Sequence, residues 1–290
     1  MIQQDEVAFR TERRKGLGGS DMPIILGLSG YMTPYQLYLE KLGLIDTPRV
    51  ETPNQYWGKQ IEHLIRNEFS KRNNVTIEAR EKRSHPILSY LKGNLDGWIK
   101  EWGAVFEAKC SIMTKAAEWS HTNQDGIPLE YLVQLAHYCI LENATCGHLA
   151  VLIGGYDYRE YKYERDDKLE KKLIEVGSQF WDAIQNQTPP PAVDEKDLLL
   201  MYPKHVETRI VAEKPIIKCI EQLRNTKLQI SEFQKKETEI RFSIMQYMQD
   251  NEALIDENEI ELATWKATKR GSRMFLLKKD KYNTEVSTDE

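Results

Sequence analysis

The sequence predicts an α/β domain, in which helices flank a central mixed β-sheet, followed by a long helix and a β-hairpin. Segments with apolar residues at helical spacing, notably 55–72 and 128–143, are interspersed with strand-like segments such as 148–153. A run of prolines at 189–191 then interrupts the chain, and such a run favours a domain boundary. We therefore expect one domain over residues 1–191 and an extension over residues 192–290.

The composition is that of a globular protein with no general attraction to nucleic acid. The 290 residues are 40% apolar and 29% charged, and the formal net charge is −5. Any binding of nucleic acid must therefore come from a local basic face. No apolar run is long enough for a membrane span and no leader segment is recognisable, so we expect a cytoplasmic protein without a membrane partner. The four cysteines form no C-x-x-C pair, which argues against zinc or iron–sulfur sites.

The amino-terminal segment combines basic residues with a glycine-rich turn. Arg13 and Arg14 precede this turn, and Ser20 and Asp21 follow it at the place of a helix N-cap. Arginines, a hydroxyl group and helix amides that converge on one point predict an anion site, most naturally for a phosphate. The alternative is a capped helix with a basic lead-in and no ligand.

The next elements contain the first acidic candidate. Helices are predicted over residues 35–42 and 55–72, and Glu62 lies within the apolar face of the second. A carboxylate in this place either meets a metal ion or a cation inside the protein, or lies on the flank of the helix. Strands are then predicted over residues 75–80 and 87–96.

A hairpin follows and carries the candidate catalytic groups. Asp96 ends the preceding strand, and Glu107 and Lys109 flank Ala108 in an apolar strand. Because successive strand residues point to opposite faces, Glu107 and Lys109 point the same way. Two carboxylates suit a hard divalent ion, and an ammonium beside them can orient or deprotonate a water molecule. This pattern is typical of a site that cuts phosphodiester bonds, although a solvated strand face is the alternative.

The rest of the domain is predicted to contain helices over residues 114–121 and 128–143. The longer helix places Tyr131, Gln134 and Tyr138 near one face. This face is either directed at a substrate or, as is more common for tyrosines, belongs to a core helix with solvated edges. Two strands and a helix complete the domain, over residues 148–153, 158–163 and 166–186.

The extension is predicted to begin with one long helix. Apolar residues recur at spacings of three and four between residues 216 and 248, as in a coiled coil. A lone helix cannot bury such a stripe, so it must lie on the domain, on the terminal hairpin or on another subunit. The hairpin is predicted from strands over residues 260–268 and 273–277, and the last ten residues should be a loose tail.

Several of these segments together resemble a known family. In chain order they are RRKGLGGSD, ILGLSGYMTPYQLYLEK, WGKQIE, LDGW and FEAK. The series is similar to that of YqaJ-type viral recombinases, which are phage alkaline exonucleases similar to lambda exonuclease and have the PD-(D/E)XK nuclease fold. The resemblance spans about residues 9–190, and the carboxy-terminal part resembles an extension that many members carry. One departure is Leu95, where many members have proline before the aspartate.

The resemblance implies a two-metal site. Asp96, Glu107 and the carbonyl of Ala108 would hold one magnesium ion. Asp96 and Glu62 would reach a second, and manganese should be able to substitute for magnesium. Lys109 matches the catalytic lysine that orients or activates the attacking water.

The resemblance also implies contacts to DNA. Gln134 matches a glutamine near the reacting phosphate, and Arg13 and Ser20 match the residues that hold a 5′ phosphate. Arg13 is favoured by its seven-residue spacing from Ser20, and Arg14 is the alternative phosphate ligand. Tyr131 is assigned to the DNA-binding face beside Gln134.

The implied activity is magnesium-dependent, processive degradation of double-stranded DNA from 5′ ends, leaving 3′ overhangs for phage-type recombination by strand annealing. Besides DNA ends, the implied partners are two further copies in a ring-shaped homotrimer and a single-strand annealing protein, in the cytoplasm of a bacterial host. Two alternatives remain open. One is a PD-(D/E)XK endonuclease of restriction or repair type, which needs no phosphate pocket. The other is a non-catalytic DNA-binding scaffold, which has no reason to keep the acids and the lysine.

Overall fold

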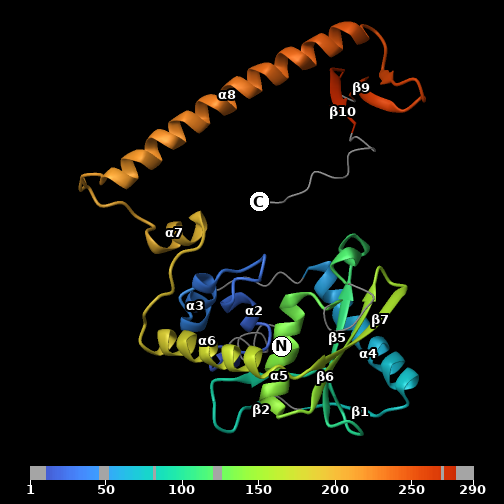
Figure 1. The fold of residues 1–290 in the computed structure, drawn as a ribbon, viewed down its shortest axis with the longest axis vertical. Coiled ribbons are helices and arrows are strands. Elements are labelled where there is room, and N and C mark those ends of the chain that lie inside the picture. The colour runs from blue at the N-terminus through green and yellow to red at the C-terminus, as the bar shows by residue number, and fades with distance from the viewer. Residues whose placement is uncertain (1–10, 46–51, 81–82, 120–125, 269–270, 279–290) are drawn as a thin grey trace. The chain divides into compact units, whose positions relative to one another are not determined.

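The computed structural model describes five segments of the chain, residues 11–45, 52–80, 83–119, 126–268 and 271–278. They belong to two compact units, Met1–His205 and Val206–Glu290, which are coloured from blue to yellow and from yellow to red in Figure 1. Each unit is described by itself. The predicted loose tail lies outside the described residues.

The first unit is built on a five-stranded mixed sheet in the order β1-β4-β5-β6-β7 (Figure 1). β4 and β5 form the predicted antiparallel hairpin, with Trp98 opposite Val105. β5 and β6 run parallel, and helix α5 connects them. The predicted α/β fold with a mixed sheet is therefore confirmed. The strands span Ile77–Glu78 (β1), Gly97–Ile99 (β4), Ala104–Ser111 (β5), Cys146–Ile153 (β6) and Asp157–Glu164 (β7).

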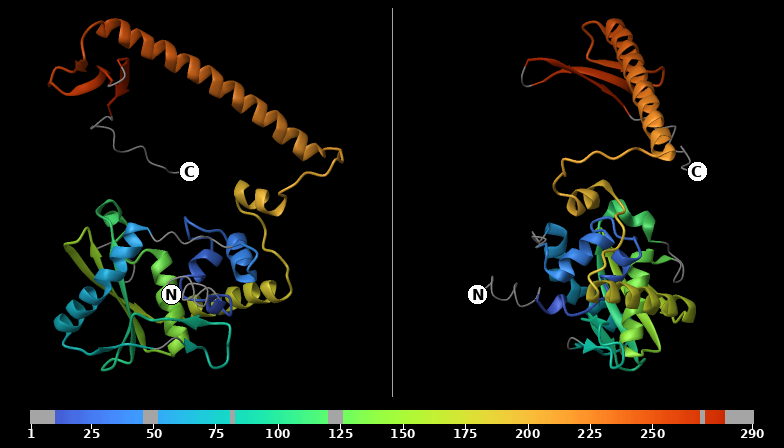
Figure 2. Two further views of the ribbon diagram at one scale, coloured as in Figure 1. Left: turned by 180° about the vertical axis from the view of Figure 1, so that it is seen from behind. Right: turned by 90° about the vertical axis from the view of Figure 1, so that its left-hand side faces the viewer.

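Helices cover both faces of this sheet, as the two further views in Figure 2 also show. Val105 packs in the core beneath α5, whereas its neighbour Phe106 packs on the opposite face against Phe69 of α4. This alternation follows from the pleat of β5. The predicted long helices are confirmed as α4 (Pro53–Asn73), α5 (Leu129–Glu142) and α6 (Asp167–Gln185).

The amino-terminal helices are short and pack beside α6. Helix α2 spans only Met22–Ile25, and α3 spans Pro34–Leu42 with a capping box between Thr33 and Gln36. Gly43 ends α3 with a φ of 72°, a left-handed conformation that glycine adopts without strain. A separate core cluster joins Leu37 of α3 to Phe180 of α6.

Two local predictions were wrong. The strand predicted over 87–96 is reduced to β3 (Lys92–Gly93), which pairs with β2 (Arg83–Ser84). The ring of His85 accepts hydrogen bonds from the amides of Ile87 and Leu88, and these bonds close a turn where the strand was expected. The α-helix predicted over 114–121 is a 3₁₀ helix, η1 (Met113–Glu118).

The first unit extends beyond the predicted boundary at residue 191. Helix α7 (Glu195–Met201) follows the prolines, and its Asp197 is fully buried. Asp197 accepts hydrogen bonds from the hydroxyl of Thr33 at 2.7 Å and from the amide of Val193. This buried carboxylate links the segment before α7 to Thr33, at the start of α3. Helix α7 therefore belongs to the first unit.

The second unit consists of α8 (Lys214–Met248) and a three-stranded antiparallel sheet in the order β10-β9-β8. The predicted hairpin is confirmed as β9 (Glu261–Ala267) and β10 (Arg273–Leu277), and β8 (Ala253–Ile255) adds a strand that was not predicted. None of the described helices is both long and apolar enough to cross a membrane.

Candidate active site

Four polar side chains form a connected group on the face of the sheet that α5 covers. We call Asp96, Glu107, Lys109 and Gln134 the catalytic cluster. The Lys109 ammonium lies 2.6 Å from Oε1 of Glu107 and donates a hydrogen bond to Oε1 of Gln134 at 3.1 Å. The Gln134 amide donates in turn to Oε1 of Glu107 at 2.8 Å. The structure thus brings together three residues that the sequence predicted on β5 and α5.

Asp96 joins the cluster through the backbone of β5. Its Oδ2 accepts a hydrogen bond from the amide of Ala108 at 2.9 Å. Burial and the neighbouring Glu107 carboxylate raise the pKa of Asp96 to about 7, against the attraction of Lys109. Burial alone would lower the pKa of Lys109, but Glu107 and Asp96 raise it, so Lys109 stays charged. The cluster therefore holds two acids against one fixed cation.

The raised pKa of Asp96 predicts a pH-dependent cost in stability. Near pH 4, Asp96 is protonated in the folded chain and about half protonated in the unfolded chain, and below pH 3 it is protonated in both. As the pH rises to about 7, the unfolded chain ionises first, so this group destabilises the fold progressively. With a chelator present, Asp96→Asn should therefore stabilise the protein at pH 8 by about 4 kcal/mol, and by little at pH 4.

Thermal unfolding at the two pH values measures this difference. Glu175→Gln on the exposed face of α6 serves as the control and should change stability little at either pH. An equal stabilisation of Asp96→Asn at both pH values would contradict a raised pKa.

Glu62 lies near the cluster but has its own partner. It comes from α4, on the other side of the hairpin, and its Oε1 lies 2.6 Å from the guanidinium of Arg66 one turn later. Burial and the charge of Asp96 raise the pKa of Glu62, which shows that the two carboxylates interact. The structure therefore places Glu62 beside Asp96 and makes Arg66 a neighbour that the sequence did not reveal.

The donor set suits a hard cation at Glu107. This side chain is 3% exposed, and the described residues offer no hydrogen-bond partner for its Oε2. A buried carboxylate oxygen without a partner is costly unless a cation binds it. Among the described residues, no three acidic, histidine or cysteine side chains already converge as a metal cluster. A metal ion would therefore be held by Glu107 and Asp96 together with backbone oxygen.

Tyr131 lies over the exposed side of the cluster. The Lys109 ammonium is 5.2 Å from the centroid of its ring, and the ring stacks on Trp119 at 5.2 Å. Burial raises the pKa of Tyr131 to about 12, so the phenol stays neutral. Tyr131 and Gln134 both line a cavity of about 380 Å³, which we call the tyrosine cavity.

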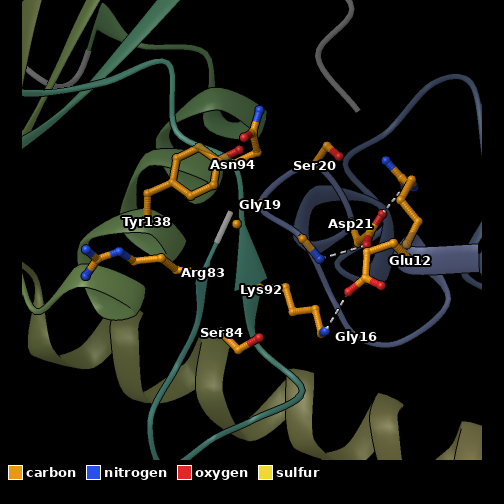
Figure 3. A pocket seen from close by; sticks show the side chains of 13 residues that line it. Glu12, Gly16, Gly19, Ser20, Asp21, Arg83, Ser84, Lys92, Asn94 and Tyr138 are labelled. Carbon is orange, nitrogen blue, oxygen red and sulfur yellow. Dashed lines mark hydrogen bonds and ion pairs between the residues drawn. The ribbon is translucent and has the colours of Figure 1, made fainter. Parts of the chain in front are cut away.

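The glycine-rich turn lines another cavity, of about 180 Å³, which we call the amino-terminal cavity (Figure 3). Figure 3 shows Ser20 and Glu12 on one side of it, and Tyr138 and Arg83 on the other. Lys92 lines it as well and lies 3.3 Å from Glu12. Ser20 lines both cavities. Tyr138 connects this region to the cluster, because its hydroxyl accepts a hydrogen bond from Gln134.

A buried ion pair holds the glycine-rich turn in place. Lys41 and Asp21 are both almost fully buried, with their charged atoms 2.6 Å apart. The Lys41 ammonium also donates to the backbone carbonyls of Arg13 and Gly16. Asp21 in turn accepts a hydrogen bond from the amide of Gly18, and its carboxylate lies 2.5 Å from the guanidinium of Arg13. One lysine therefore fixes both ends of the turn.

This network corrects two expectations about the anion site. Helix α2 has four residues and its N-cap, Asp21, makes no side-chain capping bond, so the site is not built on a helix terminus. Arg13 lines the amino-terminal cavity but is engaged by Asp21 and, at 3.6 Å, by Glu40. Arg14 donates to the carbonyl of Glu40 and packs under Gly43. Of the two arginines, Arg13 is the one that lines the cavity.

Sequence reasoning missed the residues that come from distant segments. Arg83 and Lys92 reach the amino-terminal cavity from β2 and β3, which were not predicted as a pair. Lys41 lies at the end of a helix, where a basic residue is expected at the surface. The glycine at position 19 was a signal in the sequence that this turn packs closely against another element. A Cβ there would lie 2.7 Å from the ring of Tyr138.

Comparisons with known proteins agree on one family. A model of the family described as YqaJ-like viral recombinase domain matches residues 8–145. The uncharacterized protein YqaJ of Bacillus subtilis (strain 168) is 31% identical over 250 residues, which cover 83% of this chain and 77% of that protein.

Among solved structures, the alkaline exonuclease LHK-Exo from Laribacter hongkongensis aligns with a TM-score of 0.49 and 13% identity, covering 61% of this chain and 91% of that one. The phage-related exonuclease from Haemophilus somnus 129PT aligns with a TM-score of 0.45 and 12% identity, covering 59% of this chain and 96% of that one. The identity with the Bacillus subtilis relative is higher and extends over most of both chains. On that ground, this chain belongs to the YqaJ-like viral recombinase family.

Proposed function

We propose that this protein is a magnesium-dependent nuclease that degrades double-stranded DNA from 5′ ends. The observation that carries the proposal is the catalytic cluster, in which two interacting acids, one charged lysine and one glutamine meet on one face of the sheet. The buried Oε2 of Glu107, without a partner among the described residues, supports a divalent cation as the missing ligand. Such a set is suited to hydrolysis of a phosphodiester.

Glu107, Asp96 and the carbonyl of Ala108 are the residues that would hold one ion, and Glu62 with Asp96 would reach a second. Bound magnesium, or manganese in its place, supplies Lewis acidity and lowers the pKa of a water molecule. Glu62 contacts Arg66 through Oε1, so it would take part either through Oε2 or after giving up that contact. The raised pKa of Asp96 means that metal binding competes with a proton below about pH 7, so activity should increase towards alkaline pH.

The other members of the cluster act on the water and the phosphate. Lys109 is held by Glu107 and Gln134, so its ammonium has a fixed direction from which to orient the attacking water and to offset charge on the phosphate. Gln134 is 9% exposed and contacts both partners, and we assign to it the positioning of Lys109. Tyr131 bounds the cavity in which the DNA strand would lie.

The amino-terminal cavity is the proposed site for the 5′ phosphate. Ser20 provides a hydroxyl where the two cavities meet, and Lys92 and Arg83 provide positive charge beside Arg13. Arg13 is held by Asp21 at 2.5 Å, whereas Lys92 and Arg83 form longer ion pairs, with Glu12 at 3.3 Å and with Glu142 at 3.6 Å. The lysine and Arg83 can therefore turn to a phosphate more readily than Arg13. An end held here and a bond cut at the cluster would give digestion from the 5′ terminus.

Ser20→Ala tests the phosphate site. A hydrogen bond to a charged group contributes about 1.5–3 kcal/mol, so this change should slow digestion of 5′-phosphorylated duplexes about ten-fold or more. Ends that carry a 5′ hydroxyl should be affected much less. Lys92→Ala should act in the same direction, whereas Ser243→Ala, at an exposed position of α8, is the matched control. Equal slowing of both substrates by Ser20→Ala would place the phosphate elsewhere.

The proposed polarity is tested with two preparations of one linear duplex, in which the same strand is labelled either at its 5′ end or at its 3′ end. With magnesium, a 5′ label should be released at once as a nucleotide, while a 3′ label on the same strand stays in long products until late. The opposite order would contradict the polarity, and release from internal positions first would favour an endonuclease. The homotrimeric ring and the annealing partner implied by the resemblance belong to the same proposal. Sedimentation of the DNA-free protein tests the ring, which predicts three copies or, where a two-fold contact joins two rings, six.

A further inference from the structure

Helix α8 has an apolar stripe that the second unit does not cover. Met248, at its carboxy-terminal end, is its one buried residue in the described structure. The terminal sheet therefore packs against that end and cannot cover the rest. The stripe runs over about 50 Å of helix, with Ile216, Leu223, Ile230, Phe233 and Ile240 between 49% and 69% exposed.

The stripe follows a seven-residue repeat with two core positions, as in a coiled coil. The first core position is occupied by Ile216, Leu223, Ile230, Glu237 and Ile244. The second is occupied by Cys219, Thr226, Phe233, Ile240 and Tyr247. Each series is interrupted once by a polar residue, Glu237 in the first and Thr226 in the second. A polar residue at such a position selects the direction and alignment of the partner helix.

Glu237 excludes one arrangement of two such helices. In a parallel, aligned pair each core residue faces its own copy, so two Glu237 carboxylates would meet in the apolar seam. Lys236 would also lie against Arg241 across the flank of the seam. Like charges placed together in this way destabilise the pair.

We propose that α8 pairs with α8 of a second copy of this chain in antiparallel orientation, centred between Ile230 and Phe233. In an antiparallel pair the first core position of one helix faces the second core position of the other. This alignment places Ile230 against Phe233 of the second copy, and Leu223 against its Ile240. The two interruptions coincide, because Glu237 then faces Thr226 of the second copy.

Charge complementarity supports this alignment. Lys227 follows Thr226 on the flank of the seam, so it lies at the level of Glu237 of the second copy and beside it. By the two-fold symmetry of the pair this contact forms twice. The carboxylate therefore gains a hydroxyl and an ammonium from the second copy, whereas a parallel pair would set it against its own copy and leave it only Arg241 of its own helix, at 3.9 Å. The pairing uses no residue of the catalytic cluster and is independent of the proposed nuclease activity.

Natural Cys219 allows a direct test of orientation. The antiparallel alignment places Cys219 against Ile244 of the second copy, while the two Cys219 residues lie roughly 40 Å apart. In the full chain with exposed Cys110 replaced, C110S/I244C should form disulfide-linked dimers under mild oxidation, and mass spectrometry should identify a link between positions 219 and 244. C110S alone should give none. C110S/F242C is the matched control, because position 242 lies on the opposite side of the helix.

Two outcomes would overturn the proposal. A Cys219–Cys219 link in C110S would show a parallel pair, and the absence of dimers from C110S/I244C would show that α8 is covered by something other than a second α8.

A charge exchange provides an independent measurement. E237K and K227E should each raise the dissociation constant of the α8-dependent association about ten-fold, measured by sedimentation, because each places like charges together. The double variant E237K/K227E should recover most of the loss. Lys218→Glu, on the outer side of the helix, serves as the matched control. Failure of the double variant to recover would overturn the contact between Glu237 and Lys227 and with it the proposed alignment.

Discussion

Lys109→Ala, Glu107→Gln and Asp96→Asn are each expected to slow digestion of linear duplex DNA by about a thousand-fold or more, while the protein stays folded. Removal of one group that stabilises charge in a transition state typically costs a hundred- to a thousand-fold, and the two carboxylates are in addition the proposed metal ligands. The effects should not add in combination, because the three side chains act through one hydrogen-bonded group.

Two further variants show whether the loss is specific. Glu62→Ala should be severe but should leave measurable activity, because Glu62 is bound to Arg66 and serves only the second ion in the proposal. Lys162→Ala removes an exposed lysine on β7 that pairs with Glu164 and should leave the rate unchanged. Circular dichroism and thermal unfolding identify variants that have lost their fold. Near-normal digestion by folded Lys109→Ala would show that the cluster does not catalyse the cleavage.

Lys41→Met is expected to destabilise the first unit by about 3–5 kcal/mol, since it leaves the buried Asp21 carboxylate without its principal partner. Arg13 would remain as a second partner of Asp21, which places the loss toward the lower figure. The matched control is Glu68→Ala, which breaks an exposed pair with Arg72 on α4 and should change stability little. Denaturant unfolding at pH 7 measures both.

The pH dependence of this loss has a definite sign. Burial alone would raise the pKa of Asp21, but Lys41 and Arg13 outweigh it and hold the pKa below the usual value. The stabilisation from this pair is therefore present above the unfolded pKa and disappears as the pH falls through the folded one. Wild type and Lys41→Met should converge in stability in acid, and a constant difference down to low pH would contradict an ionic origin.

The parts of the fold that were predictable are those specified by local pattern. The alternation around Val105 and Phe106 gave β5 and its two faces, and with them the common direction of Glu107 and Lys109. The helical spacing in α5 put Gln134 on one face with Tyr131 and Tyr138, and the same kind of spacing predicted α8. These patterns are local because a pleat or a helical turn repeats within a few residues.

The parts that were not predictable depend on partners distant in the sequence. The apolar residues around Leu91 resembled a strand, but Leu91 instead bridges to Leu17 of the glycine-rich turn. The phosphate site was expected at a helix start. Instead, the glycine-rich turn is held by Lys41 of α3, which donates hydrogen bonds to the carbonyls of Arg13 and Gly16. Asp197 anchors α7 to Thr33, which is why the first unit continues past the prolines. In each case a tertiary contact replaced the structure that the local pattern favoured.

In the proposed function, the catalytic cluster cuts DNA from ends with the help of a divalent metal ion. The most direct test incubates the protein with one plasmid in two forms, linearised and covalently closed, with magnesium or with chelator. With magnesium we expect complete loss of the linear form and an intact closed circle. We expect no digestion with chelator and none by Glu107→Gln. Nicking or cutting of the closed circle, or digestion of the linear form by Glu107→Gln at the wild-type rate, would contradict the proposed function.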